Sequence, residues 1–338
     1  MRNRALDILR IVACIMIVTM HAPMPTGEEN GIFLASLSYL TAPGIGLFFM
    51  LSGALLLPMK TGVKAFLKNR FVKIAVPTVL WSCIYLILNA YLHGKPLSWQ
   101  VVISIPFSAQ GTPTFWFLYT LMGLYLIAPI LSRWVQKASC RELEFYLVLW
   151  AVSLCYPLLR SIMDINVSQT GILYYLSGYV GYFILGYYLK TYPDRIPFKW
   201  LLPFVMVAIV VPIYCKVKMI PVDFYSVFWY LSIFVSILCV FIWRLVMLLF
   251  PEREGGRGSS PFVAHISQLS FGVYLTHYFI IREILWDLER IRQIPSFVLQ
   301  TVMIILLALL GSFMVSGIIA CLPGSGFLIG TNFSRRHE

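Results

Sequence analysis

The chain has 338 residues, of which 59% are hydrophobic and only 12% are charged, and its mean hydropathy is +0.82. A soluble protein of this length is excluded, because a compact globule must still face water and an ordinary soluble domain has about 25% charged residues. The formal charge of +12 could suggest a nucleic-acid partner, but lysines and arginines retained on the cytoplasmic side of a membrane explain it more simply, so we expect none.

The apolar segments are long and continuous, unlike the alternating strands of about ten residues in a membrane β-barrel. We therefore predict an all-α polytopic membrane protein with about ten transmembrane helices. We expect residues 1–338 to form a single integral-membrane domain. In chain order, the predicted spans cover residues 7–24, 38–59, 71–92, 114–133, 143–161, 171–190, 199–217, 224–248, 261–281 and 296–322.

The distribution of basic residues predicts the orientation of these spans. With the N-terminus inside, 19 of the 26 lysines and arginines fall on the inner side and seven on the outer side. Because inner loops of membrane proteins retain an excess of lysine and arginine, both termini are expected in the cytoplasm. The same bias favours an even number of spans.

The first predicted span contains three ionisable residues, which are costly in lipid and are therefore candidates for function. Arg10 and His21 are eleven residues apart, so they share a helix face and are separated by about 16 Å along the axis. Asp7 lies one turn before Arg10 and could hold its guanidinium in place. The alternative is that Arg10 only anchors the helix at the interface and that His21 lies in the headgroup region.

A second set of polar residues is predicted on the inner side. Ser52 lies near the end of the second span, and Arg70 and Lys73 lie three residues apart at the start of the third. The two cations are either ordinary anchors on the cytoplasmic side or an anion site, for example for the phosphates of a nucleotide-bearing donor.

Other candidate residues lie in the outer halves of two spans. His277, in the ninth span, is predicted at a depth comparable to that of His21, either as a hydrogen-bonded structural histidine or as part of a site. Trp116 and Tyr119 belong to an aromatic stretch in the fourth span, and such stretches are often an interfacial belt.

Together these motifs resemble the acyltransferase-3 family of bacterial membrane proteins, from residue 5 to about residue 320. Its D-x-x-R motif, followed after ten residues by H, is matched by Asp7, Arg10 and His21. The residues that match its other landmarks are Phe48–Gly53 for F-F-x-x-S-G, Trp116–Tyr119 for W-F-L-Y and Ser270–His277 for S-x-G-x-Y-x-x-H. The R-x-x-R motif is changed to Arg70-x-x-Lys73, which keeps the charge but loses one planar guanidinium.

The resemblance implies transfer of an acetyl or other short acyl group from cytoplasmic acyl-CoA, such as acetyl-CoA, to a hydroxyl of a surface polysaccharide or lipid-linked sugar. It also implies a multi-pass protein of the bacterial inner membrane. Arg10, Arg70 and Lys73 would bind the donor phosphates, and the pantetheine arm would run along the first helix towards His21. His21 would act as general base or form an acyl-histidine. The residues expected to support the site are Asp7, Ser52, Trp116, Tyr119 and His277, and no metal is expected.

Two other functions remain open from the sequence. Intramembrane histidine and arginine could form a proton relay in a transporter or flippase of a lipid-linked glycan, although the chain has none of the internal repeats that many transporters show. A non-catalytic membrane assembly protein would not need His21. The identity of the acceptor, the choice between acetyl and another acyl group, and the oligomeric state are left open.

Overall fold

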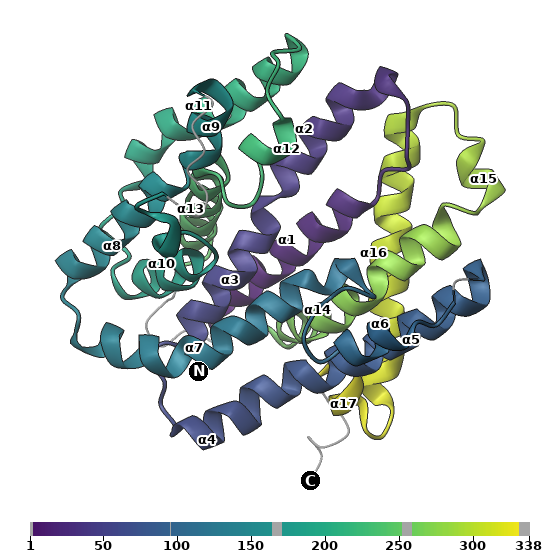
Figure 1. Ribbon diagram of the computed structural model, residues 1–338, viewed down its shortest axis with the longest axis horizontal. Coiled ribbons are helices and arrows are strands. Elements are labelled where there is room, and N and C mark those ends of the chain that lie inside the picture. The colour runs from purple at the N-terminus through teal and green to yellow at the C-terminus, as the bar shows by residue number, and fades with distance from the viewer. Residues whose placement is uncertain (1–2, 95, 164–170, 252–258, 331–338) are drawn as a thin grey trace.

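The computed structural model describes residues 3–94, 96–163, 171–251 and 259–330. The described part is helical and contains no strand, which confirms the all-α prediction (Figure 1). The first half of the chain forms α1 (Arg4–His21), α2 (Gly31–Thr41), α3 (Pro43–Leu56), α4 (Val63–Phe66), α5 (Val72–His93), α6 (Trp99–Ser104), α7 (Trp116–Lys137), α8 (Cys140–Ser153) and α9 (Tyr156–Met163). The second half forms α10 (Val180–Thr191), α11 (Phe198–Val217), α12 (Phe224–Val227), α13 (Ile233–Leu249), α14 (Pro261–Phe279), α15 (Glu289–Arg292), α16 (Phe297–Cys321) and α17 (Ser325–Ile329).

Short turns of other helix types extend several of these helices. Two of them are π-helical: η2 (Leu67–Phe71) leads into α5, and η5 (Ile280–Leu285) continues α14. Three are 3₁₀ turns, namely η1 (Glu28–Asn30), η3 (Pro113–Phe115) and η4 (Tyr174–Leu176). Single π-helical turns are frequent at functional sites.

Six helical segments of the described chain are long and apolar enough to cross a membrane, by length and composition. They are Glu28–Leu56, Val63–His93, Pro113–Lys137, Cys140–Met163, Phe198–Val217 and Phe297–Cys321. The chain is therefore a polytopic membrane protein. The helices α1, α10, α13 and α14 are shorter or more polar than these six segments. For example, the 18 residues of α1 include the charged residues Arg4, Asp7 and Arg10.

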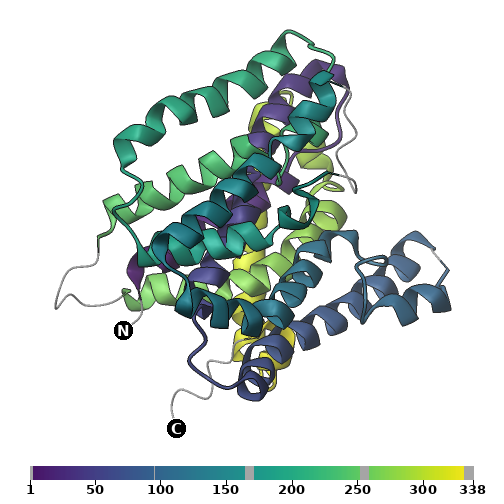
Figure 2. The same ribbon diagram turned by 60° about the vertical axis from the view of Figure 1, so that its left-hand side comes forward.

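The polar helices are shielded by the apolar ones. In the segments that contain α5, α8–α9, α11 and α16, only 17–22% of the residues in the most apolar stretch are buried inside the protein. In Glu28–Leu56, which contains α3, the share is 61%. Figure 1 shows α1 and α3 between the teal and green helices α8–α13 and the blue and yellow helices α5, α6 and α14–α17. In Figure 2, α5 and α6 project to one side of the bundle. Polar side chains on the central helices can thus avoid lipid.

Two predicted spans are less helical than expected. In the span 171–190, regular helix begins only at Val180, because the chain first makes the η4 turn and a bend at Gly178, whose φ is +98°. In the span 224–248, α12 ends at Val227 and α13 begins at Ile233. Both segments are apolar enough to suggest a full span, but apolarity alone does not distinguish a helix from a buried irregular segment.

The close contact between α3 and α10 depends on two glycines. A methyl group in place of the Gly186 hydrogen would lie 1.8 Å from the carbonyl oxygen of Met50, and one at Gly53 would lie 1.7 Å from that of Phe183. Small residues let membrane helices approach closely enough for their backbones to touch. Here the neighbouring atoms are backbone, so they cannot move aside without separating the helices.

We therefore expect Gly186→Ala to destabilise the protein by about 3 kcal/mol or more, the upper end of the usual cost of overpacking. Thermal unfolding of the purified protein in detergent measures this. Gly123→Ala is the control, because Gly123 lies in α7 with nothing within 4 Å of the added methyl group. An unfolding temperature for Gly186→Ala equal to that of the control would contradict the close packing of α3 on α10.

Candidate active site

The site is built on α1 and α14, which are joined by a buried carboxylate. Asp7 on α1 is only 5% exposed and accepts a hydrogen bond from the hydroxyl of Ser267 on α14, at 2.8 Å. Its second oxygen accepts one from Ser259, just before α14 begins. A buried carboxylate needs such donors to offset its desolvation. The two helices therefore start at the same end of the bundle and bring their C-terminal ends, with His21 and His277, to the other end.

His21 and His277 meet at these C-terminal ends. Their ring centroids are 5.4 Å apart, with the rings tilted by 42°. The ring of Tyr278 packs edge-on against His21 at 5.5 Å. His21 is half-buried, while His277 is only 2% exposed. The structure thus brings the histidine of the first span next to that of the ninth.

The hydrogen bonds of His277 determine its tautomer. Its Nδ1 lies 2.7 Å from the carbonyl oxygen of Tyr274 and 3.1 Å from that of Val273. Since a carbonyl oxygen only accepts, Nδ1 carries the proton and Nε2 of the neutral ring presents a lone pair. Nε2 is buried and has no hydrogen-bond partner among the described residues. Buried polar atoms are rarely left without a partner, and a catalytic role is one of the explanations for those that are.

A cavity of about 1340 Å³ opens at the opposite end of α1 and α14. We call it the inner cavity, because the distribution of basic residues predicts that this end faces the cytoplasm. Pockets for drug-sized ligands hold about 300–1,000 Å³, so this cavity has room for a larger molecule. Its lining residues come from α1, α3, η2, α5, α7, α10, α11, α13, α14 and α17. The residues predicted for the site that line it are Asp7, Arg10, Ser52, Arg70 and Lys73.

The cations of this cavity come from different helices. Arg70 lies in the π-helical turn η2 and Lys73 in the first turn of α5, and both side chains are exposed. Arg10 reaches the cavity from α1. The hydroxyl of Tyr125, on α7, lies beside Ser52 and close to Arg10 and Arg70. Cations and hydroxyl donors from several elements thus face one polar space.

Residues 3–321 match the sequence pattern of an acyltransferase domain, that of the acyltransferase-3 family. The chain belongs to the acyltransferase-3 family. This confirms the resemblance that the motifs indicated, and it makes the protein a membrane acyltransferase. No curated protein and no solved structure shows significant similarity to the chain.

Two further cations line the inner cavity of this acyltransferase and were missed in the sequence. Lys190, at the end of α10, donates a hydrogen bond to the carbonyl oxygen of Ala54 at 2.6 Å. Arg244, in α13, donates to the carbonyl oxygen of Pro193, and its Nε is buried without a hydrogen-bond partner among the described residues. Arg244 could have been found, because it lies inside a predicted span. Lys190 lies at the end of a predicted span, where a lysine is typical of an ordinary interfacial anchor.

Tyr274 separates the inner cavity from the histidines. It lines the cavity, while its ring lies 5.7 Å from that of His277 and 5.4 Å from that of Phe117. Its hydroxyl donates to the carbonyl oxygen of Thr114 at 2.7 Å. Neither His21 nor His277 lines the cavity, so a ligand that fills it must extend past Tyr274 to reach the histidines.

Trp116 and Tyr119 lie outside the inner cavity. Trp116 packs between the rings of Tyr179 and Tyr230, at 5.4 and 5.3 Å. The hydroxyl of Tyr119 donates to the carbonyl oxygen of Ile105 at 2.6 Å. Both residues therefore hold α7 against its neighbours. Among the described residues, no three histidine, cysteine or acidic side chains are grouped so that they could hold a metal ion.

Proposed function

We propose that this membrane acyltransferase moves an acetyl or other short acyl group from cytoplasmic acyl-CoA to a hydroxyl of a surface polysaccharide or lipid-linked sugar, in the inner membrane of a bacterium. The observation that supports this best is a basic cavity at one end of α1 and α14 and a histidine pair at the other. Acyl-CoA has a matching polarity, since its phosphates and its thioester lie at opposite ends of a long molecule.

The basic cavity suits the phosphate end of the donor. Five lysine and arginine side chains, but only two carboxylates, are among the described residues that line it. Guanidinium groups bind phosphate oxygens through paired hydrogen bonds, and lysines add positive charge. In this proposal, Arg10, Arg70 and Lys73 bind the phosphates, and Lys190 and Arg244 contribute to the positive potential.

The thioester end would then reach His21. The eleven residues from Arg10 to His21 span about 16 Å of helix, which is of the same order as an extended pantetheine arm. Tyr274 and Phe117 would flank the arm, because they lie between the cavity and the histidine pair.

The chemistry requires one proton transfer and one displacement. His21 accepts the proton of the acceptor hydroxyl as the oxygen attacks the thioester carbonyl. The carbon–sulfur bond then breaks, the proton passes to the CoA thiolate, and the products are an ester and free CoA. His277 is a positioning residue in this scheme, since it packs on His21 and its own tautomer is held by the backbone. Attack by His21 itself, through an acyl-histidine, gives the same products.

The test uses membranes of cells that produce the protein, supplied with radiolabelled acetyl-CoA. We expect label in alkali-labile esters of the surface-glycan fraction and an equal amount of free CoA. Membranes that lack the protein are the control. Movement of glycan across the membrane with no consumption of acetyl-CoA and no ester would overturn the proposal in favour of a transporter.

A further inference from the structure

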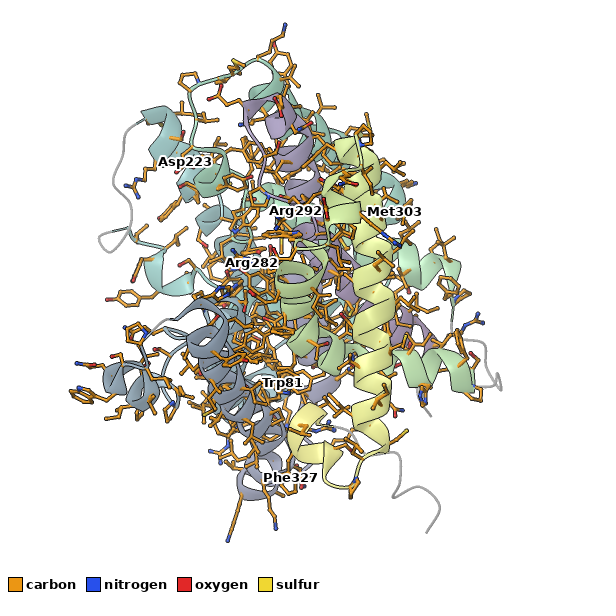
Figure 3. All side chains as sticks on the ribbon, turned by 90° about the vertical axis from the view of Figure 1, so that its right-hand side faces the viewer. Trp81, Asp223, Arg282, Arg292, Met303 and Phe327 are labelled. Atoms are coloured by element: carbon orange, nitrogen blue, oxygen red, sulfur yellow. The ribbon has the colours of Figure 1, made fainter. Side chains whose placement is uncertain are left out.

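A second cavity, of about 460 Å³, lies at the outer end of the bundle. It is formed by the end of α5, the segment around α6, the loop before α7 and the junction of α14 with η5. In Figure 3, Arg282, which lines this cavity, lies near mid-height of the molecule, well away from Phe327 of α17 at its lower end. The first cavity is lined by Ser267–Tyr274 of α14, whereas this one is lined by Tyr278 and Phe279 at the end of α14 and by Arg282 and Glu283 of η5, so the two cavities lie at different levels along this helix.

Tyr278 connects the outer cavity with His21. It lines the cavity, and its ring packs edge-on against the imidazole of His21 at 5.5 Å. Arg282 also contacts Tyr278, because it donates a hydrogen bond to the tyrosine hydroxyl at 2.6 Å. The guanidinium also lies over the rings of Tyr278 and Trp286, at 5.4 and 5.2 Å. A ligand in this cavity is thus one side chain away from the proposed base.

The polar groups of the outer cavity suit hydroxyl groups better than phosphate. Asn89 and Gln110 offer amides that donate and accept, and Glu283 offers a carboxylate that accepts. The carboxylate of Glu283 is 3.0 Å from Nε2 of His93, and Arg282 is a further cation among the lining residues. Positive and negative groups are balanced here, in contrast to the basic inner cavity. A volume of about 460 Å³ lies within the usual range for a small-molecule site.

We propose that the outer cavity binds the acceptor as an uncharged sugar unit, whose hydroxyl Tyr278 guides towards His21. This proposal rests on the proposed acyl transfer. An anionic acceptor group, such as the diphosphate of a lipid carrier, would need an excess of cations that the described lining residues do not provide. Specificity for the sugar would come from the amides and the carboxylate, since a site built to hydrogen-bond hydroxyl groups rejects ligands that lack them.

The test compares Asn89→Leu, Gln110→Leu and Glu283→Gln with Gln293→Leu, an exposed amide of the outer side that does not line the cavity. The acceptor probe is the oligosaccharide fraction released by mild acid from the surface glycan of the producing cells. For the three cavity variants we expect the KM for this probe to rise about tenfold or more, as for loss of hydrogen bonds to a bound ligand. For Gln293→Leu we expect the KM for this probe and the KM for acetyl-CoA to stay unchanged.

Binding of the same oligosaccharides, measured by isothermal titration, needs no turnover and separates the two proposals. Loss of binding in the cavity variants supports the acceptor site even if no acyl transfer is seen, in which case the acyl-transfer proposal fails alone. Unchanged acceptor KM and unchanged binding in all three variants would overturn the acceptor site while leaving acyl transfer intact. Binding only of a phosphate-bearing probe would also overturn it.

Discussion

Replacing His21 with alanine should lower the rate of acyl transfer by about 10²–10⁴, the usual contribution of a general base. The imidazole is the only proposed proton acceptor near both the donor path and the outer cavity, where Tyr278 touches it. The protein should still fold and insert, because His21 ends α1 and is half-buried. The measurements are the rate of labelled ester formation and the thermal unfolding temperature in detergent.

The matched control is His265→Ala, which removes an exposed histidine of α14 that lines neither cavity. Near-wild-type acylation by His21→Ala would refute the catalytic role of His21. The two possible routes are separated by quenching the intact enzyme and labelled acetyl-CoA in denaturant at neutral pH, where an acyl-histidine survives longer than in acid. Label that stays on the wild-type protein, is released by neutral hydroxylamine and is missing from His21→Ala indicates an acyl-histidine, whereas equal labelling of the two proteins contradicts it.

Replacing Arg10 with alanine should raise the KM for acetyl-CoA by about 10- to 100-fold, since a hydrogen bond to a charged group contributes about 1.5–3 kcal/mol. Arg70→Ala should have a similar effect, because its guanidinium faces the same cavity. Steady-state kinetics at varied acetyl-CoA measures both. Lys64→Ala is the control, because this exposed cation of α4 does not line the cavity.

A shortened donor identifies the group that these cations bind. S-acetylpantetheine carries the thioester but none of the phosphates, so it should react poorly with the intact enzyme and equally poorly with the Arg10→Ala and Arg70→Ala variants. If each variant loses the same factor with S-acetylpantetheine as with acetyl-CoA, then the arginines do not act through the phosphates. A lower unfolding temperature of the Arg10→Ala variant would point instead to a structural role of Arg10 beside Asp7.

Much of the architecture follows from composition. Because lipid requires helices that satisfy their own backbone hydrogen bonds, long apolar runs predict an all-α membrane protein, and each predicted span overlaps a described helix. Composition did not predict where regular helix begins and ends within each span. The span 171–190 is helical only from Val180 because a bend at Gly178 and the contact of α10 with α3 are decided by packing partners far away in the sequence.

The sequence by itself determined the relative positions of residues on one helix. The helical repeat is rigid, so the eleven residues between Arg10 and His21 were enough to place a cation and an imidazole on one face at opposite ends of α1. Only the tertiary structure decided which other residues join them. His277 lies beside His21, and Lys190 and Arg244 join the inner cavity, because helices distant in the chain pack together. Such contacts depend on the shapes of whole helix faces, which the spacing of motifs does not specify.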